Sequence, residues 1–381
     1  MNETSAGPAP ASNRRRTAII TVAALGAVGL AAGVGFGVGA TPGATSVAGQ
    51  GQGFSAHVAP AVNGFGGYGS GYGSGSAGPT ATPATATSEQ QVGIVDIDSL
   101  LGYQNAEAAG TGMILTSNGN VLTNNHVIDG ATSIRVTVVS TGDTYAATVV
   151  GTDPSADIAV LHLDHASGLA TAGLSTSPAT VGKAVTAVGN AGGTGILSAA
   201  NGTVTALHQS ITASDSTGSG TERLSGLIET DAGVQPGDSG GPLYDSAGAI
   251  VGMDTAASSG GVVQAYAIPI STAEGIATQI ENGITSATIQ QGYPAFLGVS
   301  VSDGQGGVTV LGVVSDGAAA QAGVTAGDVI TAIAGRTVMF PADLTAALAG
   351  HSPGQQVTVA WADATGGVHS ATVTLGTGPA R

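Results

Sequence analysis

A serine flanked by glycines stands in the most specific short segment of this chain, Gly237-Asp238-Ser239-Gly240-Gly241-Pro242. Glycines on both sides allow a tight turn in which consecutive backbone N–H groups face one point. An oxyanion hole requires that geometry, because its donors must aim at the charge that develops on a carbonyl under attack. We expect Ser239 to be a nucleophile and the amides of Gly237 and Ser239 to be the oxyanion donors. The alternative is an ordinary glycine-rich turn between strands.

A serine hydroxyl is a poor nucleophile until a base accepts its proton. Of the seven histidines, His126 is the best placed, because it follows the apolar run 121–123 where a loop opens. The imidazole also needs a buried carboxylate that fixes its tautomer. Asp157 leads directly into the largely apolar run 158–163, so we expect its carboxylate to be partly desolvated. The sequence therefore predicts a catalytic triad of Ser239, His126 and Asp157.

Short apolar or alternating runs surround these residues and predict the elements that position them. From residue 91 onward, runs of strand length alternate with turn signals, which is typical of an all-β sandwich or a pair of barrels. A helical segment at 271–281 closes this region. Beyond residue 296, strands mix with two short helices and indicate a small α+β module. We expect an all-β domain over 91–285, a linker over 286–295 and an α+β domain over 296–378.

The first ninety residues have a different composition. Residues 17–40 carry no charge and are long enough to cross a bilayer as a helix, while the arginines at 14–16 favour a cytoplasmic tail over 1–16. The alternative is a signal peptide cleaved after Ala40. Residues 41–90 are rich in Gly, Ser, Ala, Thr and Pro and predict a flexible, disordered linker. We therefore expect a single-pass protein of the cell membrane whose two folded domains are extracytoplasmic.

Charge and cysteine content exclude several classes of function. The chain has 24 acidic and 8 basic residues and a formal net charge of −16, which repels phosphate backbones, so we expect no nucleic-acid partner. The chain has no cysteine. Disulfides, thiolate metal sites and a cysteine nucleophile are therefore excluded.

The motifs resemble successive landmarks of the HtrA (DegP/DegS-like) family of trypsin-like serine proteases. The order His, Asp, Ser is that of the chymotrypsin-like proteases, and residues 123–127, 157–161, 202–206 and 237–243 look like family landmarks in that order. The resemblance covers residues 91–378. It implies a chymotrypsin-like double β-barrel with the active site between the barrels. It also implies that unfolded or misfolded polypeptides are the substrates and that no ATP, metal or other cofactor is needed.

The resemblance also implies a substrate pocket. The residue six before the nucleophile lies at the base of the S1 pocket in chymotrypsin-like proteases, and here it is Gly233, which is neutral. Ala267 and Ile268 belong to a segment that resembles the strand lining the pocket wall. We expect a small apolar pocket and cleavage after Val, Ala, Ile or Leu. The alternative is that the two strand residues are core positions.

Residues 296–378 resemble a bacterial PDZ domain. The segment Phe296-Leu297-Gly298-Val299 matches the carboxylate-binding loop, whose backbone amides hold a peptide C-terminus. The segment 327–330 matches a second PDZ landmark. The resemblance implies that C-terminal peptides are partners of this domain.

Two features depart from the family pattern. Asp238 replaces the Asn that usually precedes the nucleophile. In zymogen-activated relatives an Asp there pairs with a new N-terminal ammonium, for which residues 92–95 are the candidate site. Tyr103 is the only aromatic residue between 91 and 144, whereas family trimers pack through aromatic residues there, so the sequence gives only weak support to a homotrimer.

The rival functions are a PDZ-bearing adaptor or chaperone on a protease scaffold and a transacylase or esterase with the same triad.

Overall fold

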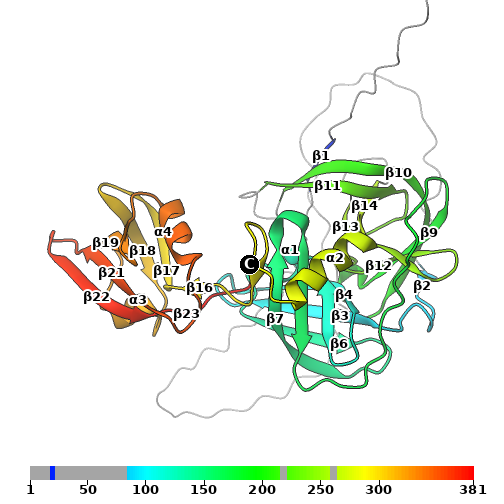
Figure 1. The fold of residues 1–381 in the computed structure, drawn as a ribbon, viewed down its shortest axis with the longest axis horizontal. Coiled ribbons are helices and arrows are strands. Elements are labelled where there is room, and N and C mark those ends of the chain that lie inside the picture. The colour runs from blue at the N-terminus through cyan, green and yellow to red at the C-terminus, as the bar shows by residue number, and fades with distance from the viewer. Residues whose placement is uncertain (1–17, 22–83, 215–220, 258–263) are drawn as a thin grey trace, which may run out of the picture. The chain divides into compact units, whose positions relative to one another are not determined.

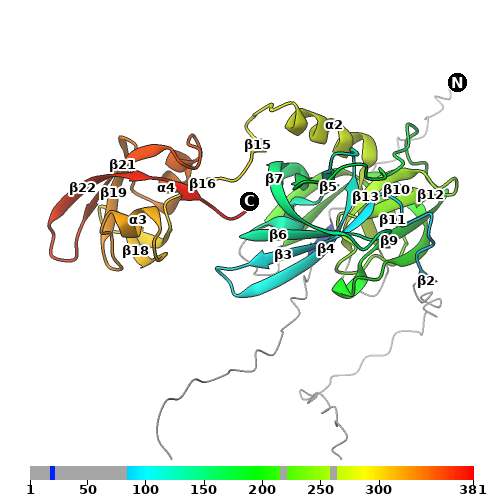
Figure 2. The ribbon, with the colours of Figure 1, turned by 90° about the horizontal axis from the view of Figure 1, so that it is seen from below.

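The computed structural model describes residues 18–21, 84–214, 221–257 and 264–381 (Figure 1). Its first sheet contains β3 (Ile94–Leu101), β4 (Ala106–Ile114), β5 (Asn120–Thr123), β6 (Ser133–Val138), β7 (Thr144–Asp153) and β8 (Ile158–Leu163), with β15 (Gln290–Gln291) at the edge. Neighbouring strands are antiparallel, and β7 also pairs with β8, so the first six strands close into a barrel. Figure 2 shows β3 beside β4 and β6, with which it pairs.

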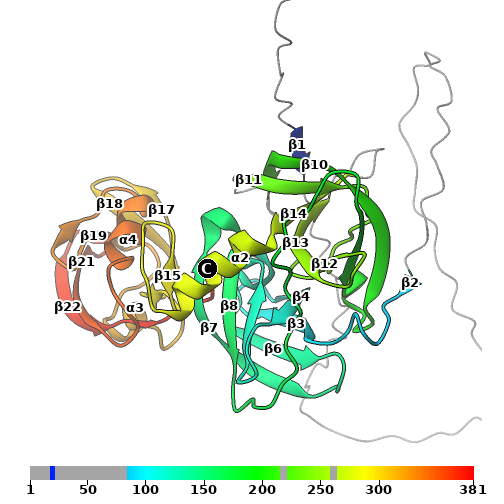
Figure 3. The same cartoon turned by 45° about the vertical axis from the view of Figure 1, so that its right-hand side comes forward.

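The second sheet closes in the same way. It runs in the order β10 (Ser198–Ser214), β11 (Thr221–Thr230), β14 (Ala265–Pro269), β13 (Ile250–Ala257), β12 (Pro242–Asp245) and β9 (Ala184–Gly189), and β9 pairs back onto β10. Helix α2 (Ile270–Glu281) packs on β7 and β8 of the first barrel and on β13 and β14 of the second (Figure 3). The expected pair of barrels is therefore confirmed.

Alternation of side chains along the strands creates three hydrophobic clusters in this region. One contains Ile97, Val121 and Leu161 of the first barrel, and another contains Val185, Ile228 and Val251 of the second. The third combines residues of both barrels with the apolar face of α2, including Leu122, Met253 and other side chains. This shared cluster fixes one barrel against the other, and so it also fixes residues that different barrels contribute to a common site.

Residues from 295 onward form the expected α+β domain. A sheet runs in the order β17 (Val299–Gly304), β18 (Gly307–Val313), β19 (Val329–Ile333), β21 (Gln356–Ala362) and β22 (Val368–Thr374), with β20 (Arg336–Thr337) beside β19. The helices are α3 (Ala318–Gln321) and α4 (Pro341–Leu348), and β16 (Ala295–Phe296) pairs with β23 (Gly376–Thr377). This domain has its own core, centred on Val308, Ile330 and Val359.

Ordered structure begins before the predicted boundary at residue 91. Strand β2 (Ala84–Thr85) pairs with β10, and Ala86 is buried in the cluster that joins the barrels. The last residues of the predicted linker, 84–90, therefore belong to the barrel domain. An apolar alanine and a free sheet edge suffice to order this short stretch, although its composition resembles that of the preceding segment.

The predicted membrane helix over residues 17–40 lies almost entirely outside the described residues, as does the predicted linker up to residue 83. Within the helix segment only β1 (Ala18–Thr21) is described, and it is a strand that pairs in parallel with β10 rather than a helix. Two isoleucines and a threonine in this stretch are β-branched and favour extended backbone where a strand is available as a partner. In the described part of the chain, no helix is long and apolar enough to cross a membrane.

Candidate active site

His126 and Asp157 come together at one end of the first barrel. His126 lies on the single-turn helix α1 (Asn125–Ile128), which follows β5 directly. Asp157 follows a 3-10 turn over residues 154–156 and precedes β8, the strand that pairs with β5. The His126 Nδ1 atom lies 2.9 Å from Asp157 Oδ2, and the His126 backbone N–H donates to Asp157 Oδ1 at 3.0 Å. Pairing of β5 with β8 is therefore what brings imidazole and carboxylate into contact.

The Asp157 carboxylate is almost fully buried, with 1% of its surface exposed. Its backbone is left-handed, with φ at +56°, a conformation that costs a non-glycine residue about 1–2 kcal/mol. Two side chains hold it in place: the Thr255 hydroxyl donates to Oδ2 at 2.5 Å, and the Asn124 amide donates to the backbone carbonyl at 3.0 Å. The bonds from Thr255 and from the His126 backbone N–H to the carboxylate compensate its charge for the loss of water, while the Asn124 bond holds the backbone.

Ser239 comes from the second barrel, in the turn before β12. Its hydroxyl donates to the backbone carbonyl of Thr255 at 3.3 Å, and Thr255 is the residue whose hydroxyl contacts Asp157. Thr255 therefore links the nucleophile candidate to the carboxylate across the two barrels. The structure thus gathers all three predicted triad residues around one strand, β13.

Glycine is required at two positions of this turn. Gly237 has a φ of +100°, and a Cβ atom built on it would lie 2.2 Å from the carbonyl oxygen of Asn190. Gly240 has a φ of +83°, and its Cβ would lie 2.0 Å from the carbonyl oxygen of Thr111. No side chain fits at such distances, so the glycines are needed for close packing as well as for backbone freedom.

The amides of the turn divide into two sets. Those of Asp238, Gly240 and Gly241 donate to the carbonyls of Gln235, Asp254 and Asp238. Among the described residues, the amides of Gly237 and Ser239 donate to no other group. Two unused donors, two residues apart and beside the serine hydroxyl, are what an oxyanion site needs.

Thr111 is a positioning residue that the sequence analysis missed. Its hydroxyl donates to the Gly237 carbonyl at 2.8 Å and accepts the Asn190 amide at 2.9 Å, while its backbone N–H donates to the Ser239 carbonyl at 2.9 Å. The side chain is completely buried. Thr111 lies in β4 of the first barrel, so it ties the turn of the second barrel to the first. No local pattern around residue 111 identifies this role.

Two further acidic side chains lie under the turn. Asp238 is 2% exposed, and burial raises the pKa of its carboxyl to about 6 although the Gln235 amide opposes this shift. Asp254 has no exposed surface, and burial together with the nearby Asp238 raises the pKa of its carboxyl well above the ordinary value. A pairing of Asp238 with an ammonium in the 92–95 segment is not formed here, because Ile94 begins β3 and its amide donates to the Gln91 carbonyl.

The predicted substrate-pocket residues do not form one surface. Gly233 is half-buried in the loop after β11, and a Cβ built on it meets only Ala200, at 3.9 Å. Ala267 and Ile268 are adjacent in β14 and therefore point to opposite faces. Both are buried, Ala267 in the cluster of the second barrel and Ile268 in the cluster between the barrels. The structure thus gives these two residues core environments, and the pocket role of Gly233 stays a prediction.

The predicted carboxylate loop lies between β16 and β17 of the α+β domain. Gly298 has a φ of +81°, and its carbonyl accepts the Val314 amide, while the Leu297 carbonyl accepts the Ala319 amide. The backbone amides of Leu297 and Gly298 donate no hydrogen bond in the described part of the chain. Phe296 ends β16, and Val299 begins β17. The loop therefore presents free donors beside a strand, as carboxylate capture requires.

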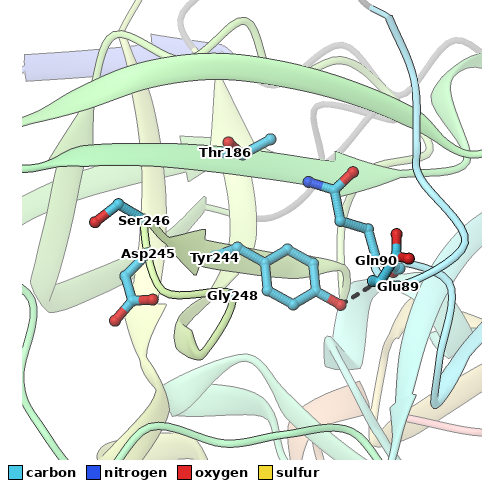
Figure 4. Close-up of a pocket in the computed structure, with 7 residues that line it drawn as sticks. All are labelled: Glu89, Gln90, Thr186, Tyr244, Asp245, Ser246 and Gly248. Atoms are coloured by element: carbon cyan, nitrogen blue, oxygen red, sulfur yellow. Dashed lines mark hydrogen bonds between the residues drawn. The ribbon is translucent and has the colours of Figure 1, made fainter.

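A surface pocket of about 270 Å³ lies apart from these residues, lined by Glu89, Gln90, Thr186, Tyr244, Asp245, Ser246 and Gly248 (Figure 4). In it the Tyr244 hydroxyl donates to the Gln90 carbonyl at 3.0 Å, which fastens the segment before β3 to the second barrel. Burial raises the pKa of Tyr244 to about 12, so the hydroxyl keeps its proton. The pocket contains no predicted site residue. No cluster of three or more metal-ligating side chains occurs among the described residues.

Comparison with known families identifies both domains. A trypsin-like peptidase domain matches residues 110–253, and a PDZ domain matches residues 295–362. The fold and the site together define a trypsin-like peptidase domain followed by a PDZ domain.

Named relatives place the chain more narrowly. It is 35% identical over 306 residues to the serine protease PepD of Mycobacterium tuberculosis, a match that covers 74% of this chain and 63% of PepD. It is 35% identical over 269 residues to a probable periplasmic serine endoprotease, DegP-like, of Brucella suis, with coverages of 67% and 50%. With the periplasmic pH-dependent serine endoprotease DegQ of Escherichia coli, it shares 35% identity over 265 residues, with coverages of 66% and 56%. The chain thus spans about half to two thirds of the length of these relatives.

Among solved structures, that of the HtrA-type protease AlgW with a tripeptide matches 77% of this chain and 96% of that chain, with 29% identity and a TM-score of 0.44. The order of the two domains and the named relatives agree with the resemblance found in the sequence. The chain belongs to the HtrA family of serine proteases with a C-terminal PDZ domain.

Proposed function

We propose that this chain is an exported serine endopeptidase that cleaves unfolded or misfolded polypeptides through an acyl-enzyme. The observation that carries the proposal is the contact of 2.9 Å between His126 Nδ1 and the buried Asp157 carboxylate, joined through Thr255 to Ser239. A buried carboxylate on Nδ1 selects the tautomer in which Nε2 carries the lone pair and can act as a base. The hydroxyl of Ser239, which contacts the Thr255 carbonyl, is the group that would supply the proton to this base.

The reaction follows from these contacts. His126 Nε2 accepts the Ser239 proton as the serine oxygen attacks the scissile carbonyl, and Asp157 stabilises the imidazolium. The free amides of Gly237 and Ser239 stabilise the negative oxygen of the tetrahedral intermediate. His126 then donates the proton to the leaving amine, and the acyl-enzyme forms. A water molecule, deprotonated by His126, hydrolyses the acyl-enzyme in the second half of the cycle.

Substrate choice is a finer proposal. Gly233 carries no charge, and a Cβ built on it meets only Ala200 within 4 Å. A neutral pocket favours uncharged side chains, so cleavage after Val, Ala, Ile or Leu is proposed. Ala267 and Ile268 are buried in the structure, and their part in the pocket wall stays a prediction.

The PDZ domain is proposed to bind C-terminal peptides through the amides of Leu297 and Gly298, with Phe296 and Val299 flanking the loop. The match of residues 295–362 to a PDZ domain supports this role, because such domains add an extended peptide to a sheet edge. Relatives named as periplasmic enzymes support an extracytoplasmic location. Anchoring by residues 17–40 and assembly as a homotrimer remain proposals from the sequence.

The test compares the full chain with its Ser239→Ala variant for casein cleavage and for labelling by a fluorophosphonate, which reacts only with an activated serine. The exposed Ser246 supplies the matched control variant, Ser246→Ala. We expect the wild type and Ser246→Ala to label and cleave, and Ser239→Ala to do neither. A wild type that binds C-terminal peptides but neither labels nor cleaves would refute the proposal in favour of a PDZ-bearing adaptor.

A further inference from the structure

Three carboxyl oxygens beneath the Ser239 turn have no hydrogen-bond partner. They are Oδ1 of Asp238 and both Oδ1 and Oδ2 of Asp254, and all three are buried. An ionised carboxylate can only accept hydrogen bonds, whereas a protonated one also donates. Two buried neighbouring carboxylates that both carry charge are strongly unfavourable, since burial and like-charge repulsion both disfavour the ionised forms. One proton placed between them would turn an acceptor into a donor and remove the second charge.

The backbone of Asp254 is part of the turn's framework. The Gly240 amide donates to the Asp254 carbonyl at 2.9 Å, and the Asp254 amide donates to the Gly241 carbonyl at 2.8 Å. Asp238 closes the other side of the turn, where its Oδ2 accepts the Gln235 amide at 2.8 Å. Repulsion between the two carboxyls would therefore act on both sides of Ser239, and directly on the peptide units that orient the amides of Gly237 and Ser239.

Neighbouring groups supply no compensating charge. Beside Asp238, the end of β9 carries Gly189, where any side chain would clash with Asp238. Opposite Asp254, β14 carries the uncharged Ala267. Asp157 is the other ionisable group beside β13, and it reaches that strand through the Thr255 hydroxyl. Among the described residues, no Lys, Arg or His contributes to the pKa shift of either carboxyl. Burial therefore acts on the pair without an opposing cation.

We propose that Asp238 and Asp254 share a single proton beneath Ser239 and that this proton holds the turn in the shape that presents the two oxyanion amides. The pair acts by positioning and does not touch the substrate. The inference rests on the proposed peptidase function, and it adds a protonation step that controls the same site. Loss of the shared proton at alkaline pH leaves two neighbouring buried carboxylates, so the turn loosens and the oxyanion amides lose their alignment.

The first test observes the proton without any catalysis. Aspartate labelled with ¹³C at Cγ is incorporated into the full-length Ser239→Ala variant, and the two resonances are assigned with Asp238→Asn and Asp254→Asn. We expect one carboxyl to titrate near pH 6 and the other to keep its proton through neutral pH. If both carboxyls titrate near pH 4, as ordinary aspartates do, no shared proton exists and the inference is wrong.

The second test asks whether the proton matters for the site. The rate of fluorophosphonate labelling is measured from pH 6 to 10 for the wild type, for Asp254→Asn, whose amide donates at every pH, and for Asp254→Leu, which lacks a donor. The exposed Asp143 supplies the control variant, Asp143→Asn. We expect the alkaline decline of the wild type and of Asp143→Asn to move by at least one pH unit in Asp254→Asn. We expect Asp254→Leu to label at least tenfold more slowly at all pH values.

An alkaline decline with the same midpoint in Asp254→Asn as in the wild type would overturn the inference, whatever Asp254→Leu does. Peptide binding by the PDZ domain and circular dichroism check that each variant is folded. If the wild type labels at no pH, the proposed peptidase function fails by itself, and the carboxyl titration still decides whether the pair shares a proton.

Discussion

Replacement of Gly237 by alanine tests the geometry of the oxyanion turn most directly. The added Cβ would lie 2.2 Å from the carbonyl oxygen of Asn190 and 3.1 Å from the Gly192 nitrogen. These are backbone atoms, so no side chain can rotate away. The turn or the loop over residues 190–193 must therefore move by roughly 1 Å before an ordinary contact is restored.

Two separate costs follow from this substitution. The φ of +100° at Gly237 is unfavourable for alanine by about 1–2 kcal/mol, which lowers stability. The forced movement also displaces an oxyanion amide, and loss of one such donor lowers kcat by about 10²–10³-fold. Gly142 separates the two costs, because its φ is +77° and a Cβ there meets nothing within 4 Å. The Gly142→Ala variant should therefore lose only the stability that the backbone conformation costs, and no activity.

The assay combines kcat/KM on a fluorogenic peptide with the thermal unfolding midpoint. We expect both variants to unfold a few degrees lower than the wild type, by roughly 2–8 °C for a domain of this size. Only Gly237→Ala should lose kcat/KM, by about 100-fold or more. If Gly237→Ala keeps activity within twofold of Gly142→Ala, the amide of residue 237 is not an oxyanion donor, and the reasoning is refuted.

Three further predictions follow from single contacts. Thr255→Val removes the hydroxyl that donates to buried Asp157, a bond worth about 1.5–3 kcal/mol, so kcat/KM should fall roughly 10- to 100-fold and recover in Thr255→Ser. Gly233→Asp should add cleavage after Lys and Arg in a peptide-library assay, since its Cβ has room beside Ala200; an unchanged profile would place S1 elsewhere. The raised pKa of Asp238 means that the native state binds a proton that the unfolded chain has lost, so this group lowers stability as pH rises from about 4 to about 6, by up to about 3 kcal/mol. Calorimetry of Asp238→Asn should show a smaller fall than the wild type, because buried Asp254, whose pKa is also raised, still contributes.

Much of the fold could be predicted from the sequence, because strands and turns leave local patterns. The alternation of apolar residues predicts β8 beside Asp157, and the glycines around Ser239 predict a tight turn. The same local reasoning chose His126, because it follows an apolar strand at the point where a loop opens. It failed where composition was ambiguous: residues 84–90 resemble the preceding linker, yet Ala86 is buried in the core.

The sequence by itself therefore determined the types of group available for chemistry and the strands that carry them. Only the tertiary structure decided which groups meet. Thr111 contacts Gly237 in the turn, 126 positions away in the sequence, and Thr255 contacts the Asp157 carboxylate, 98 positions away. Asp254, in β13, lies under the turn that holds Ser239, and its carbonyl accepts the Gly240 amide. Ala267 and Ile268 also lie in different hydrophobic clusters, because adjacent residues of a strand point to opposite faces of the sheet. The physical reason is that a local pattern reports the state of one strand, whereas these contacts depend on how two barrels close and pack on each other.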